Sequence, residues 1–256
     1  MTRGFAGALA LFLTVQCTNY VVRSPEQAPD ANDTDGITEL FAGKKIALVG
    51  FYPFRSFPDQ NSGQWVGELV YTPALQKILG FGVPVGSLKT RGTDRRVTQA
   101  NIHFFIRTYL EQTGKSGIEE MEKLFIPLPR NRYKFRRFDA DYFVMGIHTP
   151  FVETPQRSVW SALSGPGSCL TLGLVPAYGK YRSRTSVFVF DRRLNLVMSK
   201  EYSYPYRTVS SWYMLPFPRG EQITIPERGK SPPAVVFHAD LHDFRSDFAR
   251  FLRDKQ

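Results

Sequence analysis

The chain has 256 residues, of which 42% are hydrophobic and 22% are charged, and its 21 Phe and 12 Tyr exclude a fully disordered protein. The formal net charge of +10 indicates a basic surface. Such a surface can attract the phosphate groups of nucleic acid or of anionic lipid headgroups, or it can serve solubility alone.

The amino terminus has the pattern of a lipoprotein signal. Arg3 provides a positive start, and Phe5 to Val15 provides an apolar stretch of the length that secretory signals use. Cys17 follows, at the place where a cysteine thiol takes a diacylglycerol and becomes the new amino terminus. Because Gln16 precedes the cysteine in place of a small residue, the box resembles the relaxed form of spirochaete lipoproteins. We therefore expect residues 1–16 to be a signal peptide and Cys17 to be the lipid attachment site.

Two other interpretations of this segment stay open. Gly4 to Val22 has no charged residue and approaches the roughly 20 residues that span a bilayer, which would make it an uncleaved anchor. Gln16, Thr18 and Asn19 interrupt that stretch. A plainly secreted protein is the other interpretation, although the A-x-A tripeptide at Ala8-Leu9-Ala10 lies inside the apolar stretch, too early for cleavage.

A polar segment, Arg23 to Gly36, follows the signal and is rich in Pro, Asp, Asn and Ser without apolar periodicity. It predicts that residues 17–36 form a flexible tether and that residues 37–256 form one domain.

If Cys17 is lipidated or removed, Cys169 has no internal partner. A disulfide scaffold and a zinc site built from cysteines are then excluded.

The first half of the predicted domain mixes strands and helices. Lys44 to Phe51 is a nearly continuous apolar run that predicts a buried strand, and Gly63 to Thr72 alternates and predicts a second strand. Gly80 to Gly92 is rich in glycine and is expected to be a loop. Val97 to Thr113 carries one apolar stripe and predicts a helix, with Asp94 as its cap.

The second half of the domain is mainly β. A short helix at Ile118 to Phe125 is followed by an apolar strand at Tyr142 to His148. The sequence "DRRLN", which begins at Asp191, has the composition of a hairpin turn. Further strands are predicted at Cys169–Val175, Ser183–Asp191, Leu196–Tyr206 and Val209–Leu215.

The last element is an amphipathic helix. Apolar residues recur there at four-three-four-three spacing, and Asp240 is expected to point away from them. The stripe consists of Phe237, Leu241, Phe244, Phe248 and Phe251. We therefore predict a single α+β domain with a mixed, mostly antiparallel sheet, two or three helices mostly on one face, and the C-terminal helix packed on the sheet.

Two segments carry a family resemblance. Lys45 to Phe54 and Asp139 to Ile147 resemble bacterial envelope proteins similar to the curli-export lipoprotein and the TolB amino-terminal domain. Those proteins open with a lysine-preceded apolar strand that ends in Pro-Phe, and later carry Ala-Asp-Tyr before an apolar strand with Gly. The second half, with "LTLGLVPAYGKY" and "SSWYMLPF", resembles uncharacterised bacterial lipoproteins. The resemblance implies a non-enzymatic protein of the cell envelope.

Two histidine motifs were weighed for chemistry. His238 and His242 lie one helical turn apart and could ligate zinc, but Ala239 stands where a metalloprotease has Glu. Two histidines beside a packing seam are the alternative. A catalytic Cys169 would need a histidine partner such as His148, and nothing in the sequence brings the two together.

Two further segments could bind a partner. Arg130 to Phe138 alternates basic and aromatic residues, which suits nucleic acid, an anionic lipid or phosphorylated glycolipid, or merely a basic strand or loop edge. Ser158 to Gly179 and Thr208 to Pro218 contain no charged residue. Those two segments form core strands, a membrane-facing hairpin or an interface patch.

From these features we expect a non-catalytic, lipid-anchored protein of the cell envelope with a structural, assembly or binding role. The alternatives are a subunit of an oligomeric secretion or pore complex, and a hydrolase whose site is not evident from the sequence. We expect no cofactor and no metal. The expected partners are the membrane, through the lipid anchor, and an envelope protein or anionic lipid, whereas nucleic acid is not expected for an exported chain. The expected location is the outer membrane, at its periplasmic face or at the surface.

Overall fold

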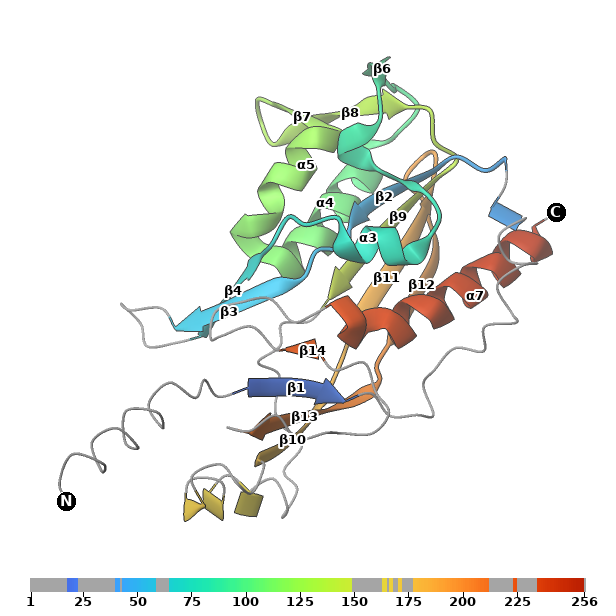
Figure 1. The fold of residues 1–256 in the computed structure, drawn as a ribbon. Helices are drawn as coiled ribbons and strands as arrows, with labels where there is room; N and C mark the ends of the chain where they lie inside the picture. Colours follow the sequence, from blue (N-terminus) through green and yellow to red (C-terminus); the bar gives the residue numbers. More distant parts are fainter. Residues whose placement is uncertain are drawn as a thin grey trace, which may run out of the picture. The chain divides into compact units, whose positions relative to one another are not determined.

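The computed structural model describes a large part of the chain in two compact units (Figure 1). Unit 1 comprises Met1–Ala28, Val152–Arg182 and Pro205–Arg228, and unit 2 comprises Pro29–Phe151, Ser183–Tyr204 and Gly229–Gln256. The expectation of one domain over residues 37–256 stays a prediction. The residues described are 18–22, 40–41, 43–58, 65–148, 163–164, 166–167, 170–171, 177–211, 223–224 and 234–255.

Unit 1 contains an antiparallel sheet with the strand order β10-β13-β1-β14. Strand β1 pairs with β13 on one side, where Thr18 lies opposite Ser211, and with β14 on the other, where Tyr20 lies opposite Thr224. The strands are β1 (Thr18–Val22), β10 (Ala177–Arg182), β13 (Pro205–Ser211) and β14 (Ile223–Thr224).

Strand β1 lies within residues 17–36, where the sequence predicted a flexible tether. The strand begins at Thr18, directly after Cys17, and is hydrogen-bonded to both neighbours, so Thr18–Val22 are part of a sheet. Residues 23–36 lie outside the described residues, where the tether stays a prediction. The uncleaved anchor over Gly4 to Val22 also stays a prediction, and β1 covers its last five residues. Cys17 itself and Cys169 lie outside the described residues.

Unit 2 is built on a mixed five-stranded sheet with the order β12-β11-β9-β2-β5. Strand β2 runs parallel to β9 and β5, whereas β11 runs antiparallel to β9 and β12. The predicted strand at Tyr142 to His148 is confirmed, and β2 is buried along its whole length, as its apolar run predicts. The strands are β2 (Ile46–Gly50), β5 (Val83–Pro84), β9 (Tyr142–His148), β11 (Thr185–Asp191) and β12 (Leu196–Tyr202).

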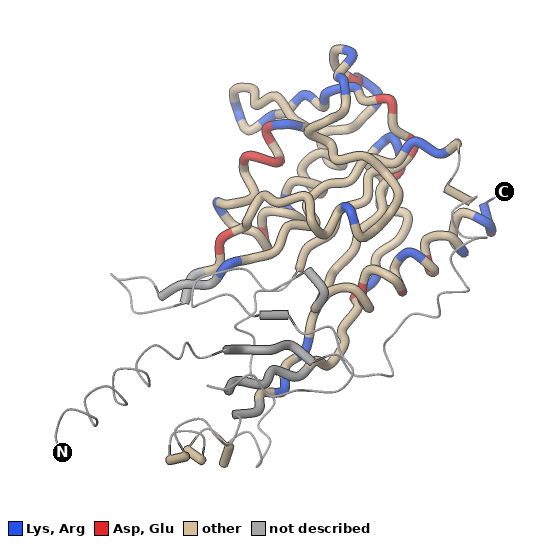
Figure 2. Tube along the Cα trace, in the orientation of Figure 1, with Lys and Arg blue, Asp and Glu red and all other residues tan. Residues whose placement is uncertain are grey.

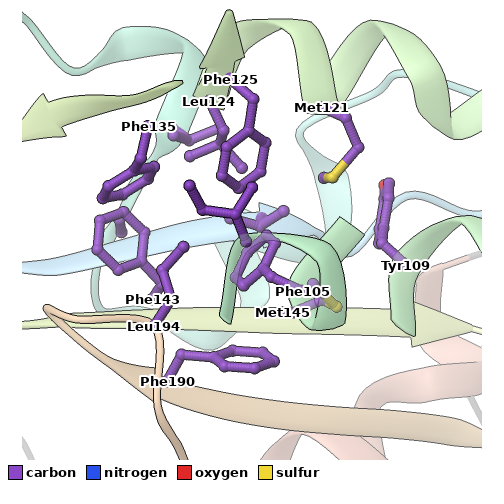
Figure 3. Packing of buried hydrophobic residues seen from close by; sticks show 14 of the residues in the cluster. Phe105, Tyr109, Met121, Leu124, Phe125, Phe135, Phe143, Met145, Phe190 and Leu194 are labelled. Atoms are coloured by element: carbon purple, nitrogen blue, oxygen red, sulfur yellow. The ribbon is translucent and has the colours of Figure 1, made fainter. Parts of the chain in front are cut away.

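Helices cover both faces of this sheet, where the sequence predicted mostly one. Because side chains alternate along a strand, Phe143 and Phe190 face helix α4 (Gln99–Thr113), and the ring of Phe105 lies 4.6 Å from that of Phe190. On the opposite face the ring of Tyr142 lies 6.0 Å from that of Phe248 in helix α7 (His238–Asp254). Figure 3 shows the first of these cores, which α4, α5 and the neighbouring strands fill with aromatic and aliphatic side chains.

The long helices form where their apolar stripes predict them. Helix α4 spans Gln99–Thr113, and its cap is the Thr98 side chain, which accepts from the Asn101 amide at 3.2 Å, rather than the predicted Asp94. Helix α5 spans Ile118–Leu124, and helix α7 spans His238–Asp254 with Leu241, Phe244, Phe248 and Leu252 buried. The C-terminal helix on the sheet and the mostly antiparallel α+β class are thus confirmed.

Short elements complete unit 2 and replace several predicted loops. The expected strand at Gly63 to Thr72 is β4, which forms a hairpin with β3, and the expected loop at Gly80 to Gly92 includes β5 and the start of β6. No helix within the described residues is both long and apolar enough to cross a membrane. These elements are β3 (Phe54–Pro58), β4 (Trp65–Leu69), α3 (Ala74–Leu79), η3 (Val85–Ser87), β6 (Thr90–Thr93), η4 (Gly114–Gly117), β7 (Phe125–Leu128), β8 (Arg132–Phe138) and η5 (Ala234–Phe237).

Candidate anion-binding site

Topology brings charged segments to one end of the five-stranded sheet. Strands β2 and β9 run parallel, with Ile46 opposite Tyr142, so their amino ends lie side by side. Strand β11 runs the other way, with Asp191 opposite Tyr142, so the turn between β11 and β12 lies at the same end. Strands β6 and β8 pair with each other, and β8 leads into β9 through Asp139 to Asp141.

Eight basic residues line three adjoining hollows at this end of unit 2. We name this set of residues the basic edge. They come from the segment before β2, from β6 and its flanks, from β8, and from the β11–β12 turn. Figure 2 shows part of this charge as Lys and Arg positions along β6 and β8. The basic edge consists of Lys44, Lys45, Lys89, Arg91, Arg96, Arg137, Arg192 and Arg193.

Three of these cations have carboxylate partners. Lys45 Nζ lies 2.6 Å from Asp139, Arg192 pairs with Asp141, and Arg96 holds Asp94 through Nε at 3.0 Å and Nη2 at 2.7 Å. The remaining five form no ion pair with any residue that the structure describes. They are Lys44, Lys89, Arg91, Arg137 and Arg193.

The arginine cavity, of about 90 Å³, is the smallest of the three hollows. Four guanidinium groups line it, from Arg91 on β6, Arg96 after β6, Arg137 on β8 and Arg192 on the β11–β12 turn. Three phenylalanine rings, which pack on one another at 5.4 to 6.0 Å, also line it, and the two acidic residues there are Asp94 and Asp139. These rings belong to Phe135, Phe138 and Phe143.

The electrostatics of the arginine cavity favour an anion. Four arginines and two aspartates give its lining a formal charge of +2. The hydrogen bonds from the Arg96 side chain lower the pKa of Asp94 to about 2, and Lys45 lowers the pKa of Asp139 in the same way. Both carboxylates are therefore ionised at neutral pH, and the positive excess persists after they are counted.

The lysine groove adjoins the arginine cavity and shares Arg91, Asp139 and Ala140 with it. Its volume is about 400 Å³. Three lysines lie along it together with Ile46, Val83 and Leu88, so that the groove combines positive charge with apolar surface. The third hollow, of about 510 Å³, is lined mainly by polar groups, including Arg192 and Arg193.

The segment Arg130 to Phe138 contributes to the site as strand β8, which confirms a basic strand; β8 is the central strand of its three-stranded sheet, between β6 and β7, and not an edge strand. Phe135 is only 2% exposed, and the half-buried side chains of Tyr133 and Phe138 pack against the core. Arg137 is the exposed residue that reaches the arginine cavity. Sequence analysis missed Lys44, Lys89 and Arg91, because single lysines and arginines become a site only when the strand pairing joins them.

His238 and His242 belong to no metal-binding cluster among the residues that the structure describes. His242 Nδ1 lies 3.5 Å from Asp243, and no cluster of three or more His, Cys, Asp or Glu side chains that could hold a metal occurs among the described residues. The prediction that Asp240 points away is wrong. Asp240 is fully buried and accepts hydrogen bonds from Ser183 at 2.8 Å and from Thr185 at 2.6 Å.

His148 joins the same buried network. Its Nδ1 lies 2.8 Å from Thr185 Oγ1, its ring packs on Phe237 at 4.4 Å, and it is fully buried. Burial lowers the pKa of His148 to about 3. In a catalytic triad the carboxylate contacts the imidazole and the imidazole contacts the hydroxyl, whereas here the Thr185 hydroxyl stands between them.

The uncharged segments Ser158 to Gly179 and Thr208 to Pro218 lie largely outside the described residues, so their assignment to core or membrane stays a prediction. The hydrolase and pore-complex alternatives stay predictions for the same reason, since Cys169 falls there too. A search against known protein families finds no match, and a comparison with curated proteins finds none either.

Proposed function

We propose that this is a non-catalytic, lipid-anchored protein of the cell envelope whose folded part binds an anionic partner at the basic edge. The observation that supports binding is the convergence of five basic side chains beside adjoining hollows, none of which forms an ion pair with a residue that the structure describes. They are Lys44, Lys89, Arg91, Arg137 and Arg193. Like charges held together repel one another, and an anion bound among them offsets that repulsion.

The proposed anchor rests on the sequence and is supported by strand β1. A signal peptide must be removed without destroying the sheet of unit 1, and β1 begins at Thr18. Cleavage before Cys17 leaves the whole strand in the mature protein. Two or three acyl chains on Cys17 would then hold the protein firmly at a membrane without a spanning helix. The proposed location is the outer membrane, at its periplasmic face or at the surface.

The anchor is tested by intact mass spectrometry of protein extracted from membranes, with the Cys17→Ser variant as control. The expected result is an amino-terminal Cys17 that carries a diacylglyceryl or triacyl mass, and its loss in the variant. An unmodified amino terminus at Met1, or one beyond Cys17, would overturn the proposed anchor.

Binding is tested on the soluble Cys17→Ser protein by sedimentation with phosphatidylcholine vesicles that contain or lack phosphatidylglycerol. We expect binding only to the anionic vesicles, and weaker binding as salt rises above about 0.15 M, because salt screens exposed charges. Reversal of three cations of the basic edge, Lys44→Glu, Lys89→Glu and Arg193→Glu together, should abolish it. A matched reversal of exposed cations elsewhere should leave binding nearly unchanged, and equal losses in the two triple variants would contradict the proposed site. The matched variant is Lys77→Glu, Lys115→Glu and Arg253→Glu.

A further inference from the structure

We propose that the arginine cavity binds a phosphate monoester and that the lysine groove holds the apolar part of the same molecule, so that the ligand is an amphiphilic phosphate. This inference rests on the proposed function and specifies its anionic partner. It follows from the size of the cavity, the way its arginines are held, its charge, and the apolar wall of the groove beside it.

The cavity has the size of a small anion. Its volume of about 90 Å³ exceeds several times the space that one water needs, roughly 10–15 Å³ on the same measure. A tetrahedral phosphate group fits such a space, and a nucleoside does not. Arg91, Arg96, Arg137 and Arg192 come from three parts of the chain, which are β6 with the residues directly after it, β8, and the β11–β12 turn, and all four line this one small cavity.

Two of the arginines are already fixed in place. Asp94, whose side chain is only 9% exposed, holds Arg96 through both carboxylate oxygens, and Asp141 holds Arg192. Two of the five side-chain N–H groups of Arg96 donate to Asp94, and three remain for a ligand. Guanidinium groups held in this way bind phosphate with little further loss of conformational freedom, because the flat fork matches two phosphate oxygens.

The charge of the cavity matches a monoester better than a diester. Its lining carries a formal +2, from four arginines and two aspartates. A phosphate monoester carries about −1.5 to −2 at neutral pH, whereas a diester carries one negative charge. A monoester therefore neutralises the lining almost fully, with Arg91 and Arg137 as the donors that have no ion pair of their own among the described residues.

The lysine groove supplies the apolar contact. It meets the cavity at Arg91, Asp139 and Ala140, and its volume of about 400 Å³ lies in the range of small-molecule sites. Val83, which is 43% exposed, lies along it with Ile46 and Leu88. Val83 is the exposed apolar residue of this wall, whereas Leu88 is half-buried and Ile46 is buried. Apolar surface directly beside an anion site suits a molecule with a phosphate at one end and hydrocarbon at the other.

The test is calorimetric titration of the Cys17→Ser protein with three soluble compounds: inorganic phosphate, short-chain phosphatidic acid below its micelle concentration, and short-chain phosphatidylcholine of the same chain length. We expect phosphatidic acid to bind about tenfold or more tighter than inorganic phosphate, which corresponds to about 1.4 kcal/mol from the apolar part. Phosphatidylcholine, a zwitterionic diester, should bind weakest. Equal affinities for phosphate and phosphatidic acid would assign the cavity to free phosphate and overturn the amphiphilic ligand.

Variants separate the two parts of the site. Arg91→Gln with Arg137→Gln should weaken both phosphate and phosphatidic acid about tenfold or more, and Val83→Ser should weaken only phosphatidic acid. Arg95→Gln with Arg253→Gln, at exposed positions outside the lining, is the matched control and should change neither. If phosphatidic acid does not bind but anionic vesicles still do, this inference fails and the proposed function stands. If the vesicles also fail to bind, the proposed function fails with it.

Discussion

Thr185 Oγ1 lies 2.6 Å from Asp240 Oδ2, and this hydrogen bond ties helix α7 to strand β11 where both side chains are fully buried. A hydroxyl has one proton, and when Asp240 is ionised Thr185 donates it to that carboxylate. His148 Nδ1, at 2.8 Å, must then donate to Thr185. His148 Nε2 has no hydrogen-bond partner among the described residues. The chain of hydrogen bonds therefore starts at Asp240 of α7 and ends at the imidazole ring.

Replacing Thr185 by Val keeps the shape of the side chain and removes the hydroxyl. His148 Nδ1 and Asp240 Oδ2 then lose a partner inside the protein, and each unsatisfied buried group costs about 1–3 kcal/mol. We expect the free energy of unfolding to fall by about 2 kcal/mol or more, as measured by urea denaturation. Thr90→Val, on an exposed strand of the same unit, is the control and should change it by less than about 0.5 kcal/mol. Similar losses in the two variants would show that the network contributes little.

The two ionisable members of the network should give opposite pH dependences. Burial raises the pKa of Asp240 from 3.8 to about 7, so the folded state holds an extra proton and stability falls as pH rises from about 4 to about 7. Burial lowers the pKa of His148 from 6.5 to about 3, so the unfolded state holds the extra proton and stability rises from about pH 3 to 6.5.

In the wild type these two slopes largely cancel between about pH 4 and 6.5. We therefore expect the Asp240→Asn variant to gain stability relative to wild type as pH rises through that window, and a His148→Gln variant to lose it. The maximal slope is about 1.4 kcal/mol per pH unit for each group. Urea denaturation at several pH values measures the difference between each variant and the wild type. If the stability of both variants followed the same pH dependence as that of the wild type, the assigned pKa shifts of Asp240 and His148 would be wrong.

Asp240 shows what the sequence could have revealed. It lies three residues after Phe237 and four before Phe244, so helical spacing alone places it on the apolar face. Its charge argued for solvent, because a buried carboxylate is rare without partners. Those partners, Ser183 and Thr185, lie more than 50 residues earlier in the chain, and only the packing of α7 on β11 brings them near.

The basic edge and β1 could not be predicted from the sequence for a related reason, because both depend on contacts between distant parts of the chain. Apolar runs and periodic stripes predicted β2, β9, α4 and α7, because a buried face requires apolar residues at the regular spacing of its helix or strand. Lys44, Arg91 and Arg192 carry no such period, and they meet only through the register of β2, β9 and β11. Strand β1 follows an apolar stretch and precedes a polar segment, and nothing in these neighbouring residues indicates its pairing with β13 and β14.

Gly50, at the end of β2, has a backbone conformation and surroundings that only glycine fits. Its φ is +74°, and a Cβ there would lie 2.4 Å from the Gly146 carbonyl oxygen and 3.0 Å from the Tyr109 ring. Gly92 has a similar φ of +80° but no atom within 4 Å of its Cβ position. Gly92→Ala should therefore cost only the left-handed strain, about 1–2 kcal/mol, and Gly50→Ala should cost several kcal/mol more. Thermal and urea unfolding measure both variants, and equal costs would contradict the close approach of β2 and β9.

A proline substitution in β1 distinguishes a paired strand at residues 18–22 from a flexible tether. Tyr20 pairs with Val209 of β13 and with Thr224 of β14, so a proline there removes a ladder hydrogen bond from an interior strand. In the Cys17→Ser protein we expect Tyr20→Pro to lower the free energy of unfolding by about 1 kcal/mol or more and to speed amide hydrogen exchange across β13. Asn32→Pro, in the polar segment Arg23 to Gly36, is the matched control and should do neither. If residues 17–36 were a flexible tether throughout, the two prolines would be equally harmless, and exchange in β13 would be unchanged by both.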